Sequence, residues 1–181
     1  MTTWKRISTP LSYDDVSLMH SGDRFLLSGI VYTARDRAHE RLRYMVAEGK
    51  ELPFMPAGQV LYYVGPSPQP RGRIIGAAGP TTSYRMDPFT EVMLKTGIRG
   101  MIGKGKRDEK TRSLLQQYGG VYFSSYGGAG AYLAKRITEA RVIAFEDLGP
   151  EAIYELRVLD FPVIVINDIY GGDLYEDAIR K

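Results

Sequence analysis

Residues 72–105 read GRIIGAAGPTTSYRMDPFTEVMLKTGIRGMIGKG, and this stretch decides the expected fold. Residues 73–78 and 98–102 are short apolar runs that predict two strands. Between them, Asp87 is a plausible helix N-cap, and Pro88 occupies the first helical position, where its missing N–H costs nothing. A strand, a helix and a second strand in this order favour a right-handed crossover and parallel pairing.

The remaining segments alternate in the same way. Residues 65–72 (GPSPQPRG) contain three prolines and two glycines and predict a surface loop. Patterns of apolar residues predict further strands at 24–33, 59–64, 121–124 and 141–145, helices at 108–118 and 130–137, and two β-rich runs at 153–159 and 162–166. Another helix is expected after the strand at 24–33, with Thr33 and Asp36 at capping-box spacing at its start and Gly49 at its end. We therefore expect one domain over residues 1–181, of class α/β, with a mainly parallel central sheet plus extra strands.

Composition excludes several classes of protein. The 24 Lys and Arg residues exceed the 21 Asp and Glu residues by three, and this excess is too small and too evenly spread for nucleic-acid binding. The absence of cysteine excludes disulfides, thiolate zinc sites and iron–sulfur ligands within the chain. Neither a signal-peptide core nor an apolar run of about 20 residues is present. We expect a soluble, cytoplasmic protein that binds neither nucleic acid nor membrane.

One glycine motif leaves an alternative open. Gly128-x-Gly130 follows a predicted strand and opens a predicted helix, as in dinucleotide-binding folds, but Leu133 occupies the third glycine position. The favoured interpretation is that Gly127, Gly128 and Gly130 permit a tight turn and close packing of helix on sheet. A dinucleotide-dependent oxidoreductase is the weaker alternative.

Residues 79–87 (GPTTSYRMD) form the strongest candidate site. They follow a predicted strand and precede a helix, at the sheet edge where open α/β folds bind ligands. Thr81, Thr82 and the next serine offer hydroxyl donors, and Arg85 follows them. Arg35 and Lys104 also follow predicted strands, so the three cations converge if those strands are neighbours. Two arginines suit a substrate with two carboxylates, because a guanidinium binds each in a bidentate fork.

The alternative is that these cations have no part in a binding site and are ordinary solvated side chains. His39, one helical turn beyond Arg35, is expected to be solvated or to lie behind the site, and it could also line the same cavity. His20 lies in a polar, turn-like stretch and is expected to be exposed.

The stretch at 72–105, together with VYTARDRAHERL at 31–42 and FPVIVIND at 161–168, resembles the β subunit of class I iron–sulfur hydro-lyases. That family comprises class I fumarate hydratases and L(+)-tartrate dehydratases, and the resemblance runs from about residue 10 to residue 172. It implies a swivelling β/β/α domain that completes an active site with a cysteine-bearing α subunit, in an α2β2 heterotetramer. It also implies a [4Fe–4S] cluster held by the α subunit and not by this chain.

The resemblance implies roles for particular residues. Arg35 and Arg85 match substrate-carboxylate ligands, and Lys104 matches the active-site lysine. Thr81 matches the proposed base, with Lys104 as its natural cationic neighbour. Thr82, from the run of three hydroxyl residues, is expected to be a further substrate-binding donor. At residues 83–84 this chain has Ser-Tyr where family members often have small residues, and this difference concerns the identity of the substrate.

The expected function is therefore reversible addition or removal of water on a small dicarboxylate, with fumarate or malate first and tartrate next. The alternative is a stand-alone dicarboxylate-binding or regulatory module without catalysis.

Overall fold

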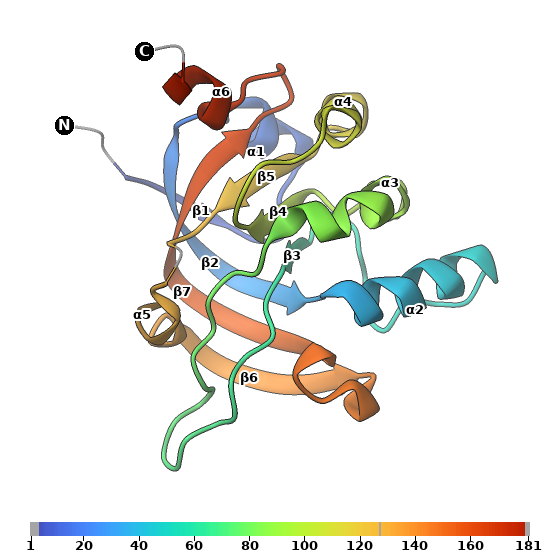
Figure 1. Cartoon of the computed structure of the whole chain (residues 1–181), viewed down its shortest axis with the longest axis vertical. Helices are drawn as coiled ribbons and strands as arrows, with labels where there is room; N and C mark the ends of the chain where they lie inside the picture. The colour runs from blue at the N-terminus through green and yellow to red at the C-terminus, as the bar shows by residue number, and fades with distance from the viewer. Residues whose placement is uncertain (1–3, 127, 180–181) are drawn as a thin grey trace.

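A seven-stranded sheet organises the computed structural model, which describes residues 4–126 and 128–179 (Figure 1). The strand order is β1-β2-β3-β4-β5-β7-β6, and an additional pairing of β2 with β7 closes the central strands into a barrel-like ring. The strands are β1 (Lys5–Ser8), β2 (Arg24–Thr33), β3 (Val60–Tyr62), β4 (Gly100–Gly103), β5 (Val121–Ser124), β6 (Ile137–Ala144) and β7 (Ile153–Asn167).

Helices fill the connections between parallel strands. Figure 1 shows α2, α3 and α4 side by side on the outer face of the ring. The helical segments are α1 (Tyr13–Ser17), α2 (Asp36–Ala47), the 3₁₀ turn η1 (Ser83–Met86), α3 (Asp87–Lys95), α4 (Glu109–Tyr118), α5 (Gly130–Ala134), the 3₁₀ turn η2 (Glu146–Glu151) and α6 (Leu174–Ile179). Among the residues described, no helix is both long and apolar enough to cross a membrane.

The pairing confirms the predicted α/β class with a mainly parallel centre. The pairs β1–β2, β2–β3, β3–β4 and β4–β5 are parallel, whereas β7 runs antiparallel to β2, β5 and β6. The two expected β-rich runs near the end form the single strand β7. They look separate in the sequence because Asp160 and Pro162 interrupt the apolar pattern, and in the structure Asp160 has a positive φ of 47° within the continuous strand.

The strand predicted at 73–78 was wrong. These residues are instead the return limb of a long loop after β3, which projects from the body of the molecule in Figure 1. Only a few bonds join the two limbs, among them Ser67 N–H to the Ala77 carbonyl at 3.0 Å and Ala77 N–H to Ser67 Oγ at 2.8 Å. The reason lies in the opposite limb, where three prolines cannot donate to a ladder, so apolar composition alone does not make a strand there.

Other boundaries also differ from the prediction. The N-cap of α2 is Arg35 rather than Thr33, whose side chain instead donates to the Ala152 carbonyl at 3.1 Å. The helix predicted at 130–137 ends at Ala134, and the next strand starts at Ile137 rather than at 141. Pairing with β7 over Ile137–Ala144 outweighs the helical spacing of the short apolar run. Asp87 is the first residue of α3 rather than its N-cap, because η1 leads directly into the helix.

Side chains alternate between two buried clusters along the central strands. On β3, Val60 and Tyr62 face the interior of the ring, while Leu61 faces the helices. On β4, Ile102 faces the ring interior and Met101 the helices. Period-two alternation places successive side chains on opposite faces, so both faces of these strands are apolar. This double burial leaves the strand ends as the place where polar groups can gather.

Candidate functional site

The candidate site lies at the carboxyl ends of β3 and β4, where the backbones that continue from the two strands separate. Residues 81–83 lie between these two backbones and hydrogen-bond to both. Thr81 N–H donates to the Tyr63 carbonyl at 2.7 Å, and Lys104 N–H donates to the Thr81 carbonyl at 3.2 Å. Ser83 N–H donates to the Lys104 carbonyl at 2.9 Å, and Thr82 pairs with Lys104 in a parallel bridge. The candidate segment therefore lies at the carboxyl edge of the sheet although no strand precedes it.

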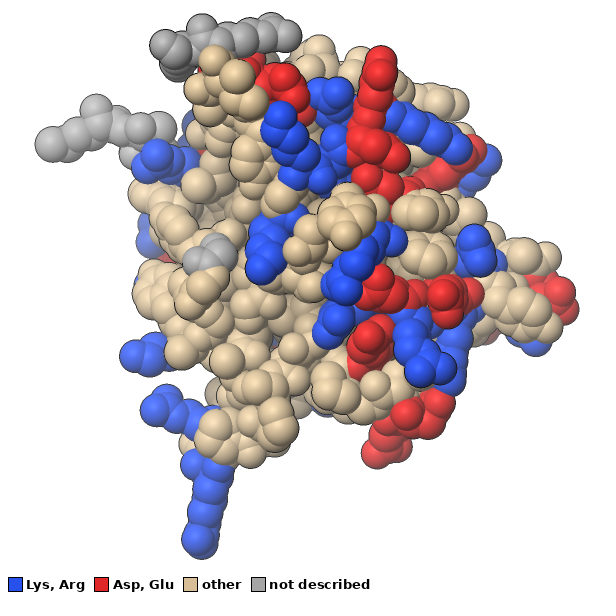
Figure 2. All heavy atoms as spheres, viewed as in Figure 1, with Lys and Arg blue, Asp and Glu red and all other residues tan. Residues whose placement is uncertain are grey.

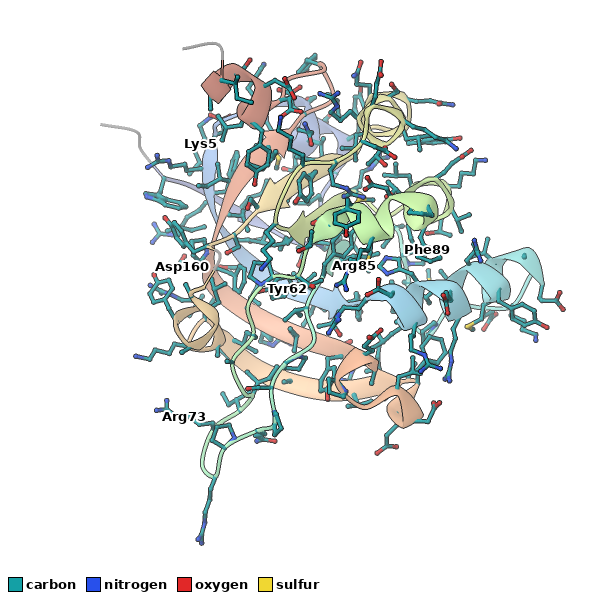
Figure 3. All side chains as sticks on the ribbon, in the orientation of Figure 1. Lys5, Tyr62, Arg73, Arg85, Phe89 and Asp160 are labelled. Carbon is teal, nitrogen blue, oxygen red and sulfur yellow. The ribbon has the colours of Figure 1, made fainter. Side chains whose placement is uncertain are left out.

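Arg35 and Arg85 converge on one carboxylate. Arg85 Nε lies 3.5 Å from Asp36 Oδ1, and Arg35 Nε lies 3.9 Å from Asp36 Oδ2. The other side of Arg35 faces Glu151, with Nη2 3.7 Å from Oε1. Figure 3 shows Arg85 between the start of α2 and the start of α3. Thus the predicted meeting of the two arginines occurs, around an acidic side chain that the prediction did not include.

Thr81 is in contact with Arg85. Arg85 Nη2 donates to Thr81 Oγ1 at 2.7 Å, so the cation beside this hydroxyl is the arginine and not the expected Lys104. The Lys104 side chain is exposed, and Nζ has no hydrogen bond or ion pair to any residue that the structure describes. Thr82 is half-buried, and its backbone adjoins Lys104.

Ser83 and Tyr84 point in opposite directions. Ser83 is fully buried, where its Oγ accepts from Lys104 N–H at 3.0 Å and lies within hydrogen-bond distance of Tyr122 OH, at 2.9 Å. The Tyr84 side chain is 62% exposed. The serine therefore belongs to the support of the site, while the tyrosine lies on its surface.

Two glycines make room for this arrangement. A Cβ at Gly65 would lie 2.5 Å from Arg35 Nη1, and a Cβ at Gly103 would lie 1.8 Å from Ser83 Oγ. Any other residue at these positions would have to displace one of those groups.

The buried Arg107 contacts Asp87, the last residue of the candidate segment at 79–87. Arg107 lies between the rings of Tyr63 and Tyr122, with its guanidinium carbon 5.5 and 4.9 Å from their centroids. It is ion-paired to Asp87 at 2.5 Å and donates to Thr90 at 2.7 Å. Burial opposes its charge, but the nearby Tyr63 and Asp87 outweigh that effect and raise the pKa of Arg107. This network joins α3 to β3 and β5.

His39 neither lines a cavity nor is solvated. It is 1% exposed and packs against the rings of Tyr63 and Phe89. Nδ1 lies 2.9 Å from the Arg35 carbonyl, and because a carbonyl only accepts, Nδ1 carries the proton. Burial lowers the pKa of His39 to about 4. It lies behind the site, one of the outcomes expected from sequence, and His20 is exposed as predicted.

The glycine motif at 128–130 packs against the loop. Ala78 N–H donates to the Gly130 carbonyl at 3.1 Å, and a Cβ at Gly130 would lie 3.0 Å from Gly79 N. Gly128 has a φ of +76°, as a tight turn requires. Gly127 lies outside the described residues. The packing interpretation accounts for Gly128 and Gly130, as favoured from the sequence.

A cavity of about 430 Å³ lies apart from these groups. It is bounded by the projecting loop, by α5 and by the start of β6, and no candidate site residue lines it. The site itself is an open sheet edge on a face of mixed charge. Figure 2 shows basic and acidic side chains interspersed over the half of that face that carries α2, α3 and α4.

Sequence reasoning missed Asp36, Glu151 and the buried Arg107. Asp36 had a signal, because it directly follows Arg35 and begins a helix. Glu151 and Arg107 had no such signal, because each reaches the site only through contacts between segments that are far apart in the chain.

The fold and these contacts define an α/β domain that presents two guanidinium groups and a threonine at one edge of its sheet. The chain belongs to the fumarase C-terminus family, whose model matches residues 5–178. This finding confirms the resemblance to the β subunit of class I hydro-lyases.

Named relatives fall into two groups. The chain is 39% identical over 155 residues to "Fumarate hydratase 1, mitochondrial" of Leishmania major, which covers 84% of this chain and 28% of the relative. It is 35% identical over 160 residues to "Fumarate hydratase class I, anaerobic" of Escherichia coli, covering 87% and 29%. It is 35% identical over 177 residues to "Putative L(+)-tartrate dehydratase subunit beta" of Methanocaldococcus jannaschii, covering 94% and 91%. The chain thus spans less than a third of those two fumarate hydratases but nearly all of the third relative.

Proposed function

We propose that this chain is the β subunit of a cytoplasmic hydro-lyase that reversibly adds or removes water on a small dicarboxylate. The observation that carries the proposal is the pair Arg35 and Arg85, which meet around one carboxylate while Arg85 also contacts Thr81. Fumarate or malate is the first candidate substrate and tartrate the next, since relatives carry both names.

A separate α subunit is the proposed partner, in an α2β2 assembly. The near full-length match to a relative named as a β subunit supports a separate chain. The chain has no cysteine, and among residues 4–126 and 128–179 no group of three or more His, Asp or Glu could hold a metal. These residues do not fit an iron–sulfur cluster, so the proposed [4Fe–4S] group has its ligands on the partner, where it would supply Lewis acidity.

The roles proposed for this chain follow from charge and contact. Arg35 and Arg85 bind the two substrate carboxylates and offset the negative charge that develops as the carbon-bound proton leaves. Thr81 Oγ1, having lost its own proton to solvent, accepts that proton as an alkoxide and becomes a neutral hydroxyl again. An alcohol is a weak base, and the Arg85 N–H at 2.7 Å would stabilise its alkoxide. Thr82 adds a substrate-binding hydroxyl, and the exposed Lys104 adds a cation on a flexible stem at the same edge.

Reconstitution tests this function. The chain, combined anaerobically with a candidate cysteine-bearing α subunit, should interconvert a hydroxy-diacid and its dehydrated product. The substrates tested are malate, fumarate and both chiral tartrates, and each reaction is followed by the absorbance of the carbon–carbon double bond. The isolated chain should show no turnover. Turnover by the isolated, metal-free chain would contradict the two-subunit proposal, and an inactive complex that still binds dicarboxylates would favour the binding-module alternative.

A further inference from the structure

Asp36 lies between the two arginines, and the proposed reaction gives it no part. Its two oxygens face Arg85 Nε at 3.5 Å and Arg35 Nε at 3.9 Å. Both distances exceed those of N–H···O hydrogen bonds but lie within the range of an ion pair. Both Nε atoms are buried and have no hydrogen-bond partner among the described residues. The carboxylate therefore acts on both guanidinium groups through its charge.

We propose that Asp36 is a positioning residue that holds the guanidinium groups of Arg35 and Arg85 together and keeps Arg85 aimed at Thr81. This inference rests on the proposed function for its catalytic consequence. Two like charges that share a small space repel each other, and a carboxylate between them offsets that repulsion. Without it, each arginine gains by turning toward water, and Arg85 loses its alignment with Thr81 Oγ1.

The position of Asp36 is fixed by its helix and by the neighbouring turn η2. It is in the first turn of α2, where the positive end of the helix dipole favours a carboxylate. Arg35, the N-cap, makes no capping bond with its own side chain. Instead Glu151 Oε2 accepts the Arg37 N–H at 3.0 Å, while its other oxygen faces Arg35. The start of α2 is therefore fastened to η2, and Asp36 is carried to a fixed place.

The charges predict an unusual kinetic signature. Two arginines and two carboxylates, Asp36 and Glu151, give a cluster with no net charge. Removing the charge of Asp36 makes the cluster more attractive to a dianion but leaves its arginines less well placed. Asp36→Asn in the reconstituted complex should therefore lower kcat by about ten-fold or more, with KM unchanged or lower. A residue needed only for folding would raise KM or lower the yield of folded protein instead.

Glu40→Gln is the matched control. Glu40 is on the same helix, one turn further along, exposed, and without an ion pair to any residue described. The substitution removes the same charge from the same element and should leave kcat and KM within about two-fold. Asp36→Glu, which keeps the charge on a longer side chain, should retain the wild-type KM and an intermediate kcat. It also replaces Asp36→Asn if that variant does not fold.

A second measurement does not depend on turnover. In the isolated chain, the Nε–H signals of Arg35 and Arg85, assigned with Arg→Lys variants, should exchange slowly with water in nuclear magnetic resonance spectra. Asp36→Asn should speed that exchange by about ten-fold or more, while Glu40→Gln should not. Unchanged exchange or unchanged kcat in Asp36→Asn overturns the proposal. If the wild-type complex has no turnover, the proposed function fails, and the exchange comparison still decides the role of Asp36.

Discussion

Thr81 and Arg85 are four residues apart in the chain, and their side chains meet at 2.7 Å because η1 turns the backbone between them. A guanidinium hydrogen bond favours the charged form of its acceptor, so this contact is the feature that makes a threonine base physically reasonable. Lys104, expected in that position, contributes its backbone to Thr81 and directs its side chain to solvent.

At the residue scale, a pair of substitutions tests the role of Thr81. Thr81→Ser keeps the hydroxyl and should retain much of the activity of the reconstituted complex. Thr81→Ala removes the proton acceptor and should lower kcat by roughly 10²- to 10⁴-fold with little change in KM. It should also stop exchange of the substrate's carbon-bound proton with deuterated water. A raised KM with surviving kcat and continued exchange would show that Thr81 only positions a carboxylate.

At the scale of elements, α2 is the helix that places the acidic and basic groups of the site. Its first turn carries Asp36, its N-cap is Arg35, and Glu151 of η2 accepts the Arg37 N–H within that turn. The loop after β3 passes close by, and Gly65 leaves the space that Arg35 occupies. Small backbone features of neighbouring elements therefore control where one guanidinium lies.

Substitution of Gly65 tests this dependence. The new Cβ of Gly65→Ala would meet Arg35 Nη1 at 2.5 Å, and that long side chain can move away at little cost in stability. It would also lie 3.2 Å from the Pro150 carbonyl oxygen, a contact that a small backbone shift relieves. We expect KM for the dicarboxylate to rise by about ten-fold while the melting temperature changes little, since one bidentate contact is misplaced.

Gly49→Ala, just beyond the other end of α2, is the reciprocal control. It meets no atom within 4 Å but has a φ of +65°. That substitution should cost about 1 kcal/mol of stability and leave KM unchanged. The same KM in both variants would contradict the role given to Gly65.

At the scale of the whole molecule, β7 closes the ring by pairing with β2 on one side and with β5 and β6 on the other. Closure brings η2, which precedes β7, next to the start of α2, and so delivers Glu151 to Arg35. The helices on the outer face then bury His39 between sheet and α3. Stability of the fold is therefore linked to the protonation of this one buried imidazole.

The free energy of unfolding should depend on pH through His39. Its folded pKa of about 4 lies below the unfolded value of 6.5, so between these values the unfolded state binds more protons. Stability is complete above pH 6.5 and is lost as the pH falls toward 4, by about 3 kcal/mol from this residue. Urea unfolding at pH 7, 5.5 and 4.5 measures it. His39→Asn, which keeps a donor for the Arg35 carbonyl, should show a shallower decline, and equal slopes would contradict the assignment.

Local patterns in the sequence determined the helices α2, α3 and α4, the strands β2 to β5 and the place of the candidate segment. These predictions succeeded because apolar periodicity and helix-end signals act over a few residues. The meeting of Arg35 with Arg85 was expected on the condition that the strands before them are neighbours, and it occurs although no strand precedes Arg85.

Only the tertiary structure decided the rest. Residues 73–78 are apolar, but their partner limb carries prolines that cannot complete a ladder, and no local pattern reveals which limb will lie opposite. Likewise, Glu151 reaches Arg35 and Arg107 enters between Tyr63 and Tyr122 only through ring closure and helix packing. Electrostatic contacts of this kind depend on distances between segments far apart in the chain, and those distances are properties of the folded molecule.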